Sequence, residues 1–322
     1  MTRPAPTADI PAREWSGRDD GPGPQHLRWH GAVTPLRPGD PPGACTLVGF
    51  RSDEGVRRNQ GRPGAVRGPV TLRHELSSLA LPTPVRILDA GDIEVVGGDL
   101  AGAQRRLGGV VADLLGHGHF VVVLGGGHDV AFGSHLGIAE SGLLAPGVRL
   151  GVLNLDAHFD LRADAVPSSG TPFRQIAEYE ATLGRSLNYA VIGIAQSSNT
   201  VDLFRRADTL GVRYLLDDWC TTATLPAVEA FVDEFLRRCD AVHLSVDLDV
   251  LPAAVAPGVS APAAFGVPLE VVTRVCEMVA AGGKLALVDV AELNPRYDID
   301  NRTARTAAGL VHRVVTRRGG GG

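Results

Sequence analysis

The sequence predicts an α/β protein in which a mostly parallel sheet lies between helices. Apolar runs rich in β-branched residues, such as residues 120–124 and 150–155, are typical of strands buried on both faces. From residue 85 onward these runs alternate with segments that have the helical spacing of apolar positions, and the connections are short. No internal repeat or linker divides this part of the chain.

Each element follows from its own pattern. Strands are expected at 45–50, 85–88, 120–124, 150–155, 189–194, 212–216, 241–246 and 285–290, and helices at 100–115, 131–140, 201–210, 225–238, 269–281 and 303–315. Residues 52–65 are polar and glycine-rich, which predicts a long loop of the kind that lines sites. Residues 1–40 have few apolar residues and predict a flexible arm, followed by a single domain over residues 41–318.

Composition excludes several functional classes. The chain has 322 residues with a formal net charge of −5, which gives no basic surface for nucleic acid or an anionic membrane. The start of the chain lacks the apolar segment of a secretory signal, and no apolar stretch is long enough to span a membrane. The four cysteines are scattered without a CxxC pair. We therefore expect reduced thiols and a cytoplasmic protein.

Three polar clusters stand at the ends of apolar strands. They are Gly125-Gly126-Gly127-His128-Asp129, Asn154-Leu155-Asp156-Ala157-His158-Phe159-Asp160 and Ser245-Val246-Asp247-Leu248-Asp249. Ligands of open α/β sheets bind at the carboxyl ends of strands, and side chains at i, i+2 and i+4 of an extended chain point to one side. Carboxylates and imidazoles without thiols suit a pair of divalent cations.

Simpler interpretations exist for each cluster alone. A single aspartate at a strand end is usually a helix cap, and a single loop histidine is usually hydrogen-bonded. Six such groups on one rim would repel strongly without cations, so the combination favours metal. The triple glycine does not fit a phosphate loop, because Val130 stands where GxGxxG needs its third glycine and no GK[ST] follows. It predicts a tight turn that brings His128 to the rim.

The three clusters, together with the longer run SVDLDVLPAAVAPG, resemble the signatures of the ureohydrolase superfamily, which includes arginase, agmatinase and formimidoylglutamase. The resemblance covers about residues 45–315. Residues 52–65, 168–175 and 197–200 look most like the formimidoylglutamase branch. It implies a three-layer αβα sandwich with a central parallel sheet, a cofactor of two Mn²⁺ per subunit, and hydrolysis of N-formimidoyl-L-glutamate to L-glutamate and formamide in histidine degradation.

The resemblance also implies a ligand set and a mechanism. One Mn²⁺ would be bound by His128, Asp156, Asp160 and Asp247, and the other by Asp156, His158, Asp247 and Asp249. Two cations lower the pKa of a shared water, and the resulting hydroxide attacks the amidine carbon. Asp160 would shuttle the proton, and Glu292 would pair with the amidinium group of the substrate. The simpler interpretation of Glu292 is a capping carboxylate at a strand end.

One departure from the family pattern concerns the loop after the second cluster. Arginases and agmatinases carry a histidine before a glycine there, whereas this chain has Ser169 before Gly170 and no histidine in the loop. That argues against both activities. Formimidoylglutamate has two carboxylates, which arginine forks would suit. The expected substrate contacts are Arg57, Arg58, Arg162, Ser169, Arg174 and Asn199, although each arginine could equally be a solvated surface residue.

Other functions remain open at this point. The nearest is another ureohydrolase that releases urea from agmatine or a guanidino acid. A catalytically silent family member is a further possibility, and a histone-deacetylase-like zinc amidohydrolase would need a histidine pair that the sequence lacks. The expected partner is a small amidine substrate, with no nucleic acid and no membrane. The resemblance implies a homo-oligomer, either a trimer or a hexamer.

Overall fold

The computed structural model describes residues 7–319. Within that range, nine strands form one sheet in which every neighbouring pair is parallel. They are β1 (Val33–Pro35), β2 (Cys45–Arg51), β3 (Ile87–Glu94), β4 (Phe120–Leu124), β5 (Leu150–Leu155), β6 (Asn188–Ile194), β7 (Arg213–Leu216), β8 (Ala241–Asp247) and β9 (Leu285–Ala291). Their order is β1-β3-β2-β4-β9-β8-β5-β6-β7, so the predicted parallel sheet is confirmed.

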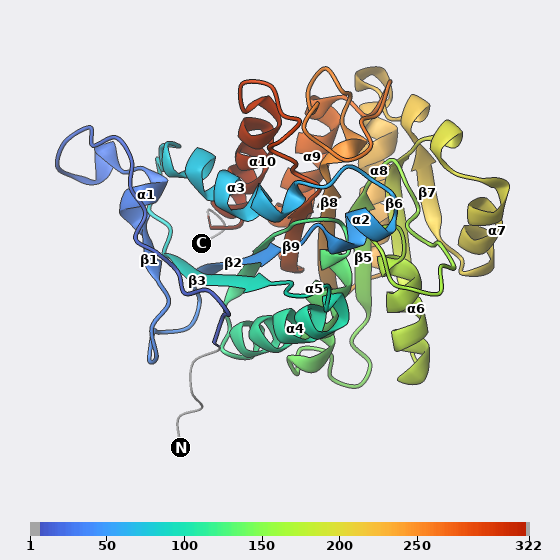
Figure 1. The fold of residues 1–322 in the computed structure, drawn as a ribbon, viewed down its shortest axis with the longest axis horizontal. Coiled ribbons are helices and arrows are strands. Elements are labelled where there is room, and N and C mark those ends of the chain that lie inside the picture. The colour runs from blue at the N-terminus through green and yellow to red at the C-terminus, as the bar shows by residue number, and fades with distance from the viewer. Residues whose placement is uncertain (1–6, 320–322) are drawn as a thin grey trace.

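Helices cover both faces of this sheet. In the described part of the chain they are α1 (Trp29–Ala32), α2 (Glu54–Arg58), α3 (Gly68–Ser77), α4 (Leu100–Gly116), α5 (Val130–Glu140), α6 (Pro172–Thr182), α7 (Val201–Thr209), α8 (Leu225–Arg237), α9 (Leu269–Ala281) and α10 (Arg302–Gly319). Figure 1 shows α3, α8, α9 and α10 on one face and α4, α5 and α6 on the other. The predicted three-layer αβα architecture is confirmed.

The central strands are apolar on both faces because each face packs on a helical layer. In β4, Val122 and Leu124 belong to the core beneath α3, α9 and α10, whereas Val121 and Val123 pack with α4 and α5. Side chains alternate along a strand, so a continuous β-branched run fills two cores at once. No helix within residues 7–319 is long and apolar enough to cross a membrane.

Several elements differ from the sequence prediction. The expected loop at 52–65 contains the short helix α2, and helices α3 and α6 were not predicted. Strand β3 continues past residue 88 through Asp89 and Asp92, both of which are buried. Arg73 of α3 pairs with Asp89 at 2.8 Å and with Asp92 at 2.6 Å. This pairing compensates the burial of two carboxylates in a strand that was expected to end at residue 88.

The predicted flexible arm is wrong for Trp29–Pro35. Trp29 is fully buried against the core of α3 and α10, its indole nitrogen donates to His312 Nδ1 at 3.0 Å, and Trp15 stacks on it. Strand β1 then pairs with β3 at the sheet edge. One large aromatic side chain supplies the apolar area that the segment otherwise lacks. Residues 1–6, which the prediction also included, lie outside the described residues.

Replacing Trp29 by alanine is expected to reduce the free energy of unfolding by about 3–5 kcal/mol, the usual cost of emptying a large aromatic site. The matched control is Trp219→Ala, because Trp219 is 67% exposed and its loss should cost less than about 0.5 kcal/mol. Urea unfolding of both variants measures the difference. Equal midpoints would show that the N-terminal segment contributes nothing to the core.

Candidate metal centre

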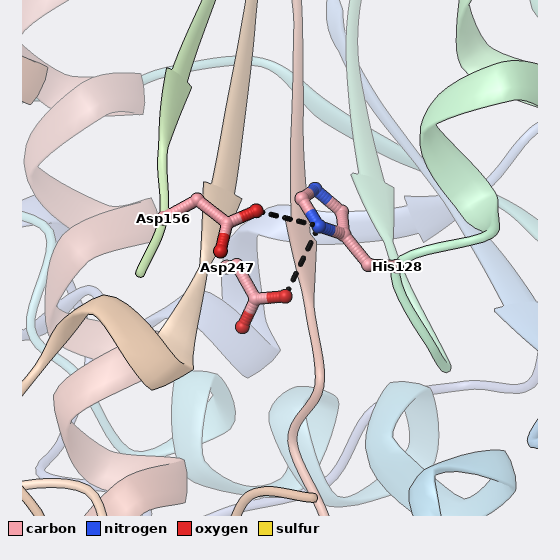
Figure 2. Close-up of side chains that lie close together, drawn as sticks. All are labelled: His128, Asp156 and Asp247. Carbon is pink, nitrogen blue, oxygen red and sulfur yellow. Dashed lines mark ion pairs between the residues drawn. The ribbon is translucent and has the colours of Figure 1, made fainter. Parts of the chain in front are cut away.

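Three polar turns meet where β4, β5 and β8 end. His128 lies between β4 and α5, Asp156 follows β5, and Asp247 is the last residue of β8. Strands β4, β9, β8 and β5 are successive in the sheet, so their carboxyl ends are neighbours. Figure 2 shows the three side chains pointing toward one another. The glycine turn permits this approach, because a side chain at Gly126 would collide with the backbone of Ser52.

The first group of candidate ligands surrounds the Nδ1 atom of His128. Carboxylate oxygens of Asp156, Asp160 and Asp247 lie 3.1, 2.9 and 3.1 Å from this nitrogen. His128 and Asp156 are fully buried, and the other two are almost so. Side chains from three separate turns therefore converge on one point.

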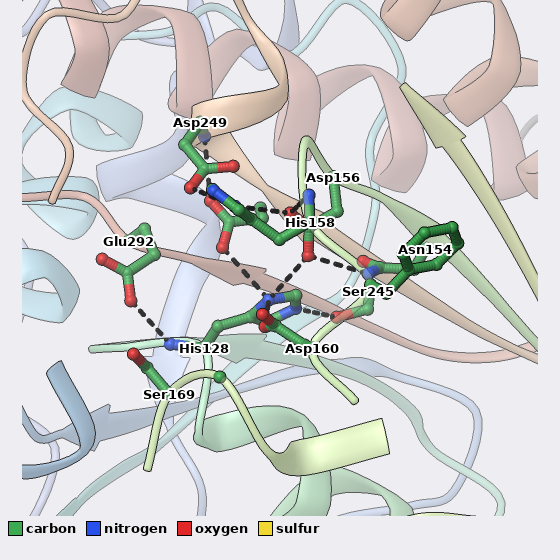
Figure 3. A network of polar contacts seen from close by, with 12 residues as sticks. His128, Asn154, Asp156, His158, Asp160, Ser169, Ser245, Asp249 and Glu292 are labelled. Atoms are coloured by element: carbon green, nitrogen blue, oxygen red, sulfur yellow. Dashed lines mark hydrogen bonds and ion pairs between the residues drawn. The ribbon is translucent and has the colours of Figure 1, made fainter. Parts of the chain in front are cut away.

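The second group shares Asp156 with the first. His158 Nδ1 lies 3.4 Å from Asp156 Oδ1 and 3.2 Å from Asp249 Oδ2. Two similar turns orient the carboxylates: Asp156 Oδ1 accepts from the backbone N–H of His158, and Asp247 Oδ1 from that of Asp249. Figure 3 shows Asp156, His158 and Asp249 around one centre, together with Asn154, whose amide donates to the other oxygen of Asp156 at 2.9 Å.

Electrostatics in this centre disfavour full negative charge. Burial and the neighbouring Asp249 and Asp156 raise the pKa of Asp247 well above its usual value. Burial and Asp156 likewise raise the pKa of Asp160 to about 6. Burial alone would also raise the pKa of Asp156, but the neighbouring imidazoles of His128 and His158 lower it overall. The carboxylates compete for a small number of positive partners, and cations would relieve that competition.

The residues fit divalent metal. His128 Nδ1, Asp249 Oδ1 and Glu292 Oε2 are buried without a hydrogen-bond partner among the described residues, although buried polar atoms are normally paired. The donor set is oxygen and imidazole nitrogen, which suits Mn²⁺. Adjacent ligands of an octahedral cation with bonds of about 2.1 Å are about 3 Å apart. The separations of 2.9–3.1 Å around His128 Nδ1 match that spacing.

A cavity of about 310 Å³ opens above this centre. Its lining combines candidate ligands with residues of the surrounding loops: Asn59, Gln60, Gly61, Arg62, His128, His158, Asp160, Arg162, Ser169, Ser198, Asn199, Leu203, Asp247, Asp249, Ser260, Ala261 and Glu292. The cavity therefore gives a small polar molecule direct access to the cluster.

Glu292 follows β9 and forms one wall of the cavity. Its Oε1 accepts from the backbone N–H of His128 at 2.9 Å, while Oε2 is buried and has no hydrogen-bond partner in the described part of the chain. Burial raises the pKa of its carboxyl group to about 8, because a single backbone hydrogen bond only partly offsets the loss of water. Its backbone has φ +67°, a strained conformation of the kind found at functional sites.

Three of the predicted substrate residues line the cavity, and their surroundings differ. Arg162 makes no side-chain hydrogen bond or ion pair that we find among residues 7–319. Ser169 Oγ accepts from the amide of Asn59 at 3.2 Å. The side chain of Asn199 is fully hydrogen-bonded: it accepts from the N–H of Phe159 and donates to two backbone carbonyls. These hydrogen bonds stabilise the turn that carries the second cluster.

The other three predicted contacts do not line the cavity. Arg57 and Arg58 both pair with Glu54. Arg174 donates to the carbonyl oxygens of residues 162 and 164 and pairs with Glu178, beside a different cavity between α6 and α7. Each guanidinium group is held by a carboxylate three or four positions away in the sequence, so these arginines point away from the site.

Sequence reasoning missed several polar lining residues. Asn59, Gln60 and Arg62 come from the loop that was expected to line a site, and Ser260 comes from the loop after β8. Arg62 is largely structural, because its guanidinium donates to the carbonyls of residues 259 and 260 and lies over the ring of Tyr297. The short α2 turns Asn59 and Gln60 inward, and nothing in the loop composition predicts that helix.

The sheet and its edge cluster define a three-layer αβα protein with a candidate metal centre of carboxylates and imidazoles. Residues 44–316 match the model of the Arginase family. The chain belongs to the arginase family, as the sequence resemblance indicated.

Known relatives agree with this assignment over nearly the whole chain. A formimidoylglutamase from Rhodococcus opacus is 60% identical over 309 residues, covering 96% of this chain and 97% of that protein. One from Nocardia farcinica is 62% identical over 307 residues, covering 95% and 97%. The resemblance to the formimidoylglutamase branch is confirmed.

Solved structures show the same fold. Formimidoylglutamase from Bacillus subtilis has a TM-score of 0.80 at 22% identity and covers 90% of this chain and 91% of its own. Formiminoglutamase from Trypanosoma cruzi, solved with Mn²⁺, has a TM-score of 0.78 at 27% identity and covers 90% and 98%.

Proposed function

We propose that this protein is a dinuclear manganese hydrolase that cleaves N-formimidoyl-L-glutamate to L-glutamate and formamide in histidine degradation. The observation that carries the proposal is the pair of overlapping ligand groups that share Asp156, at the base of a polar cavity. Relatives with 60–62% identity over at least 95% of the chain carry the formimidoylglutamase name and support the choice of substrate.

The proposed ligands divide between two ions. His128, Asp156, Asp160 and Asp247 would hold one, and Asp156, His158, Asp247 and Asp249 the other. When bound, the metal pair supplies Lewis acidity that makes water a nucleophile at neutral pH. Asp160 lines the cavity and has an oxygen close to His128, and in this proposal it accepts a proton during attack and returns it to the departing amine.

Two further groups would orient the substrate. Glu292 lines the cavity, and its Oε2 has no hydrogen-bond partner among the described residues, so an amidinium N–H can pair with it through a charge-assisted hydrogen bond. Arg162 lines the cavity, and its guanidinium has no side-chain partner within residues 7–319, so it can pair with a carboxylate of the glutamate portion. A cation at one end of the substrate and an anion at the other match this arrangement.

The direct test is a side-by-side assay of the Mn²⁺-loaded protein with N-formimidoyl-L-glutamate, arginine, agmatine and guanidinobutyrate. Glutamate and formamide from the first substrate alone would support the proposal. Urea from one of the guanidino compounds would replace it with the neighbouring ureohydrolase activity. Full Mn²⁺ loading without turnover of any of the four would contradict both.

Replacing Arg162 by glutamine is expected to raise KM for formimidoylglutamate by about 10–100-fold, the worth of one charge-assisted hydrogen bond. The value of kcat should change much less, because the reacting carbon lies at the other end of the substrate. Arg57→Gln is the matched control: Arg57 is outside the cavity and its side chain is 63% exposed. Steady-state kinetics of both variants measure these effects. Equal KM values for the Arg162→Gln and Arg57→Gln variants would show that Arg162 does not bind the substrate.

A further inference from the structure

The backbone conformation of Gln60 is unusual for its residue type. Among residues 7–319, the residues other than glycine with positive φ are Gln60, Asp160, Glu292, Asp300 and Asn301. Aspartate and asparagine tolerate this conformation, because their short polar side chains can hydrogen-bond to the local backbone. Glutamine and glutamate have longer side chains and lack that local compensation. Gln60 and Glu292 are therefore the two strained cases, and both line the cavity above the candidate metal centre.

Gln60 stands at the end of α2, where glycine is the usual residue. The N–H of Gly61 donates to the carbonyl oxygen of Val56 at 2.8 Å. The N–H of Gln60 donates to the carbonyl oxygen of Arg57 at 3.1 Å. These two hydrogen bonds form a Schellman motif, in which the residue with positive φ is most often glycine. The chain therefore has glutamine at a position where the stability of the helix end would favour glycine.

The side chain of Gln60 gives no structural reason for this choice. It is exposed and makes no hydrogen bond that we find within residues 7–319. Its neighbour Asn59 differs, because the amide of Asn59 donates to Ser169 Oγ at 3.2 Å. A glutamine amide carries two N–H donors and one carbonyl acceptor. In Gln60 these groups are available to a molecule in the cavity.

The cavity has fewer cationic partners than the proposed substrate has carboxylates. N-formimidoyl-L-glutamate carries two carboxylates, and the described lining contains two arginines and no lysine. The guanidinium of Arg62 donates to the carbonyl oxygens of residues 259 and 260. Only Arg162 then remains to pair with a carboxylate. The second carboxylate needs uncharged donors, and the amide of Gln60 provides them.

Gln60 and Arg162 lie on the same side of the cavity. A side chain at Gly170 would meet Arg162 Cδ at 2.7 Å and Asn59 Nδ2 at 3.2 Å. The stem of Arg162 and the amide of Asn59 therefore both pack against this glycine. Gln60 directly follows Asn59 and also lines the cavity. A charged and an uncharged donor group thus lie near each other, as two carboxylates joined by a short carbon chain require.

We propose that Gln60 is a specificity-determining residue whose side-chain amide donates to one carboxylate of the substrate, while Arg162 pairs with the other. The inference rests on the proposed function and deepens it, because it explains how one available arginine can serve a substrate with two carboxylates. Glutamine at the end of α2 then exchanges some stability of the helix end for substrate binding.

Gln60→Gly tests the proposal, because a binding role and a structural role predict opposite effects on stability. Glycine adopts positive φ without strain, so the thermal midpoint should equal that of the parent protein or rise. KM for formimidoylglutamate should rise about 10–100-fold, the worth of one hydrogen bond to a charged group, and kcat should change much less. Calorimetric binding of L-glutamate, which keeps both carboxylates, gives the same comparison without turnover.

Asp300→Gly is the matched control. Asp300 also has positive φ and is exposed, but it lies outside the cavity. Its replacement by glycine should likewise preserve or raise the thermal midpoint, and it should leave KM and L-glutamate affinity within about twofold of the parent values. Equal kinetics of the two variants would show that the strain at Gln60 has no connection with binding.

Amide analogues of the substrate separate the two carboxylates. N-formimidoyl-L-glutamine lacks the charge of the side-chain carboxylate, and the corresponding α-amide lacks the charge of the other. One analogue should suppress the KM effect of Gln60→Gly, and the other should suppress that of Arg162→Gln. Unchanged KM in Gln60→Gly, a lower thermal midpoint with unchanged kinetics, or suppression of both effects by the same analogue would each overturn the inference. A parent protein that binds L-glutamate but does not hydrolyse formimidoylglutamate would instead contradict the proposed function.

Discussion

Asp247→Asn should abolish measurable hydrolysis and weaken the binding of both ions. The proposed bridging carboxylate serves each cation, and asparagine keeps the shape of the side chain but removes its charge. Even outer partners of metal ligands change affinity or activity by about 10–100-fold, so a loss of at least about 10²-fold in kcat/KM is expected. Metal content and steady-state kinetics measure the two effects separately. Full turnover by this variant would contradict the proposed ligand set.

The same substitution should not destabilise the metal-free protein. The pKa of Asp247 is raised by burial and by Asp249 and Asp156, so its ionised form is less favourable in the folded chain than in the unfolded one. At pH values above the unfolded pKa, an acid with a raised folded pKa lowers stability. Removing that charge should therefore leave the thermal midpoint of metal-free protein at pH 7 unchanged or higher.

Asp92→Asn is the contrasting control. Asp92 is also buried, but it pairs with Arg73 at 2.6 Å and lies outside the candidate metal centre. Its loss should cost about 1–3 kcal/mol of stability, the worth of a buried hydrogen bond to a charged group, and leave Mn²⁺ affinity intact. Asp247→Asn should show the opposite pattern. If both variants lost stability and metal together, metal loss would be a consequence of unfolding.

The central strands and the candidate centre could be predicted because each depends on local pattern. Residues 120–124 fill two cores with alternate side chains, as expected of a continuous apolar run in a parallel sheet. The DxHxD and DxD segments converge because each first aspartate accepts from the backbone N–H two residues later. Such local hydrogen bonds are visible in a sequence as spacing.

Features that depend on distant partners could not be predicted in the same way. The expected strand ends at residue 88, because the burial of Asp89 depends on Arg73, which neutralises it only in the folded chain. Trp29 reads as part of a polar arm until α3 and α10 are placed around it. In both cases, contacts between residues remote in sequence outweigh the local composition.

The sequence spacing of acidic residues distinguishes the arginines that lie outside the cavity from the one that lines it. Arg174 has Glu178 four residues later, and Arg58 has Glu54 four residues earlier. Such pairs on a helix are a standard reason for a guanidinium to lie along the helix surface. Arg162 has no acidic residue three or four positions away, and it is the arginine of the four that reaches the cavity.

Glu292→Gln is expected to lower kcat/KM by about 10²–10³-fold, the usual cost of removing one preorganised electrostatic contact to the reacting group. Glutamine has the same shape and keeps an oxygen for the N–H of His128, so the β9 turn should be preserved. The carboxylate charge that would pair with the amidinium is lost. Mn²⁺ affinity should stay within about twofold of the parent, because Glu292 belongs to neither candidate ligand group.

Glu180→Gln controls for the loss of a buried glutamate. Glu180 lies on α6, outside the cavity, and pairs with His135 and Arg185. Its replacement should therefore reduce stability and leave kcat/KM unchanged. Glu292→Asp adds a second contrast, since it keeps the charge but withdraws it by one methylene. If Glu292→Gln kept full activity, or lost it only because Mn²⁺ was lost, then Glu292 would be a structural cap of the β9 turn and the amidinium would need another partner in the cavity.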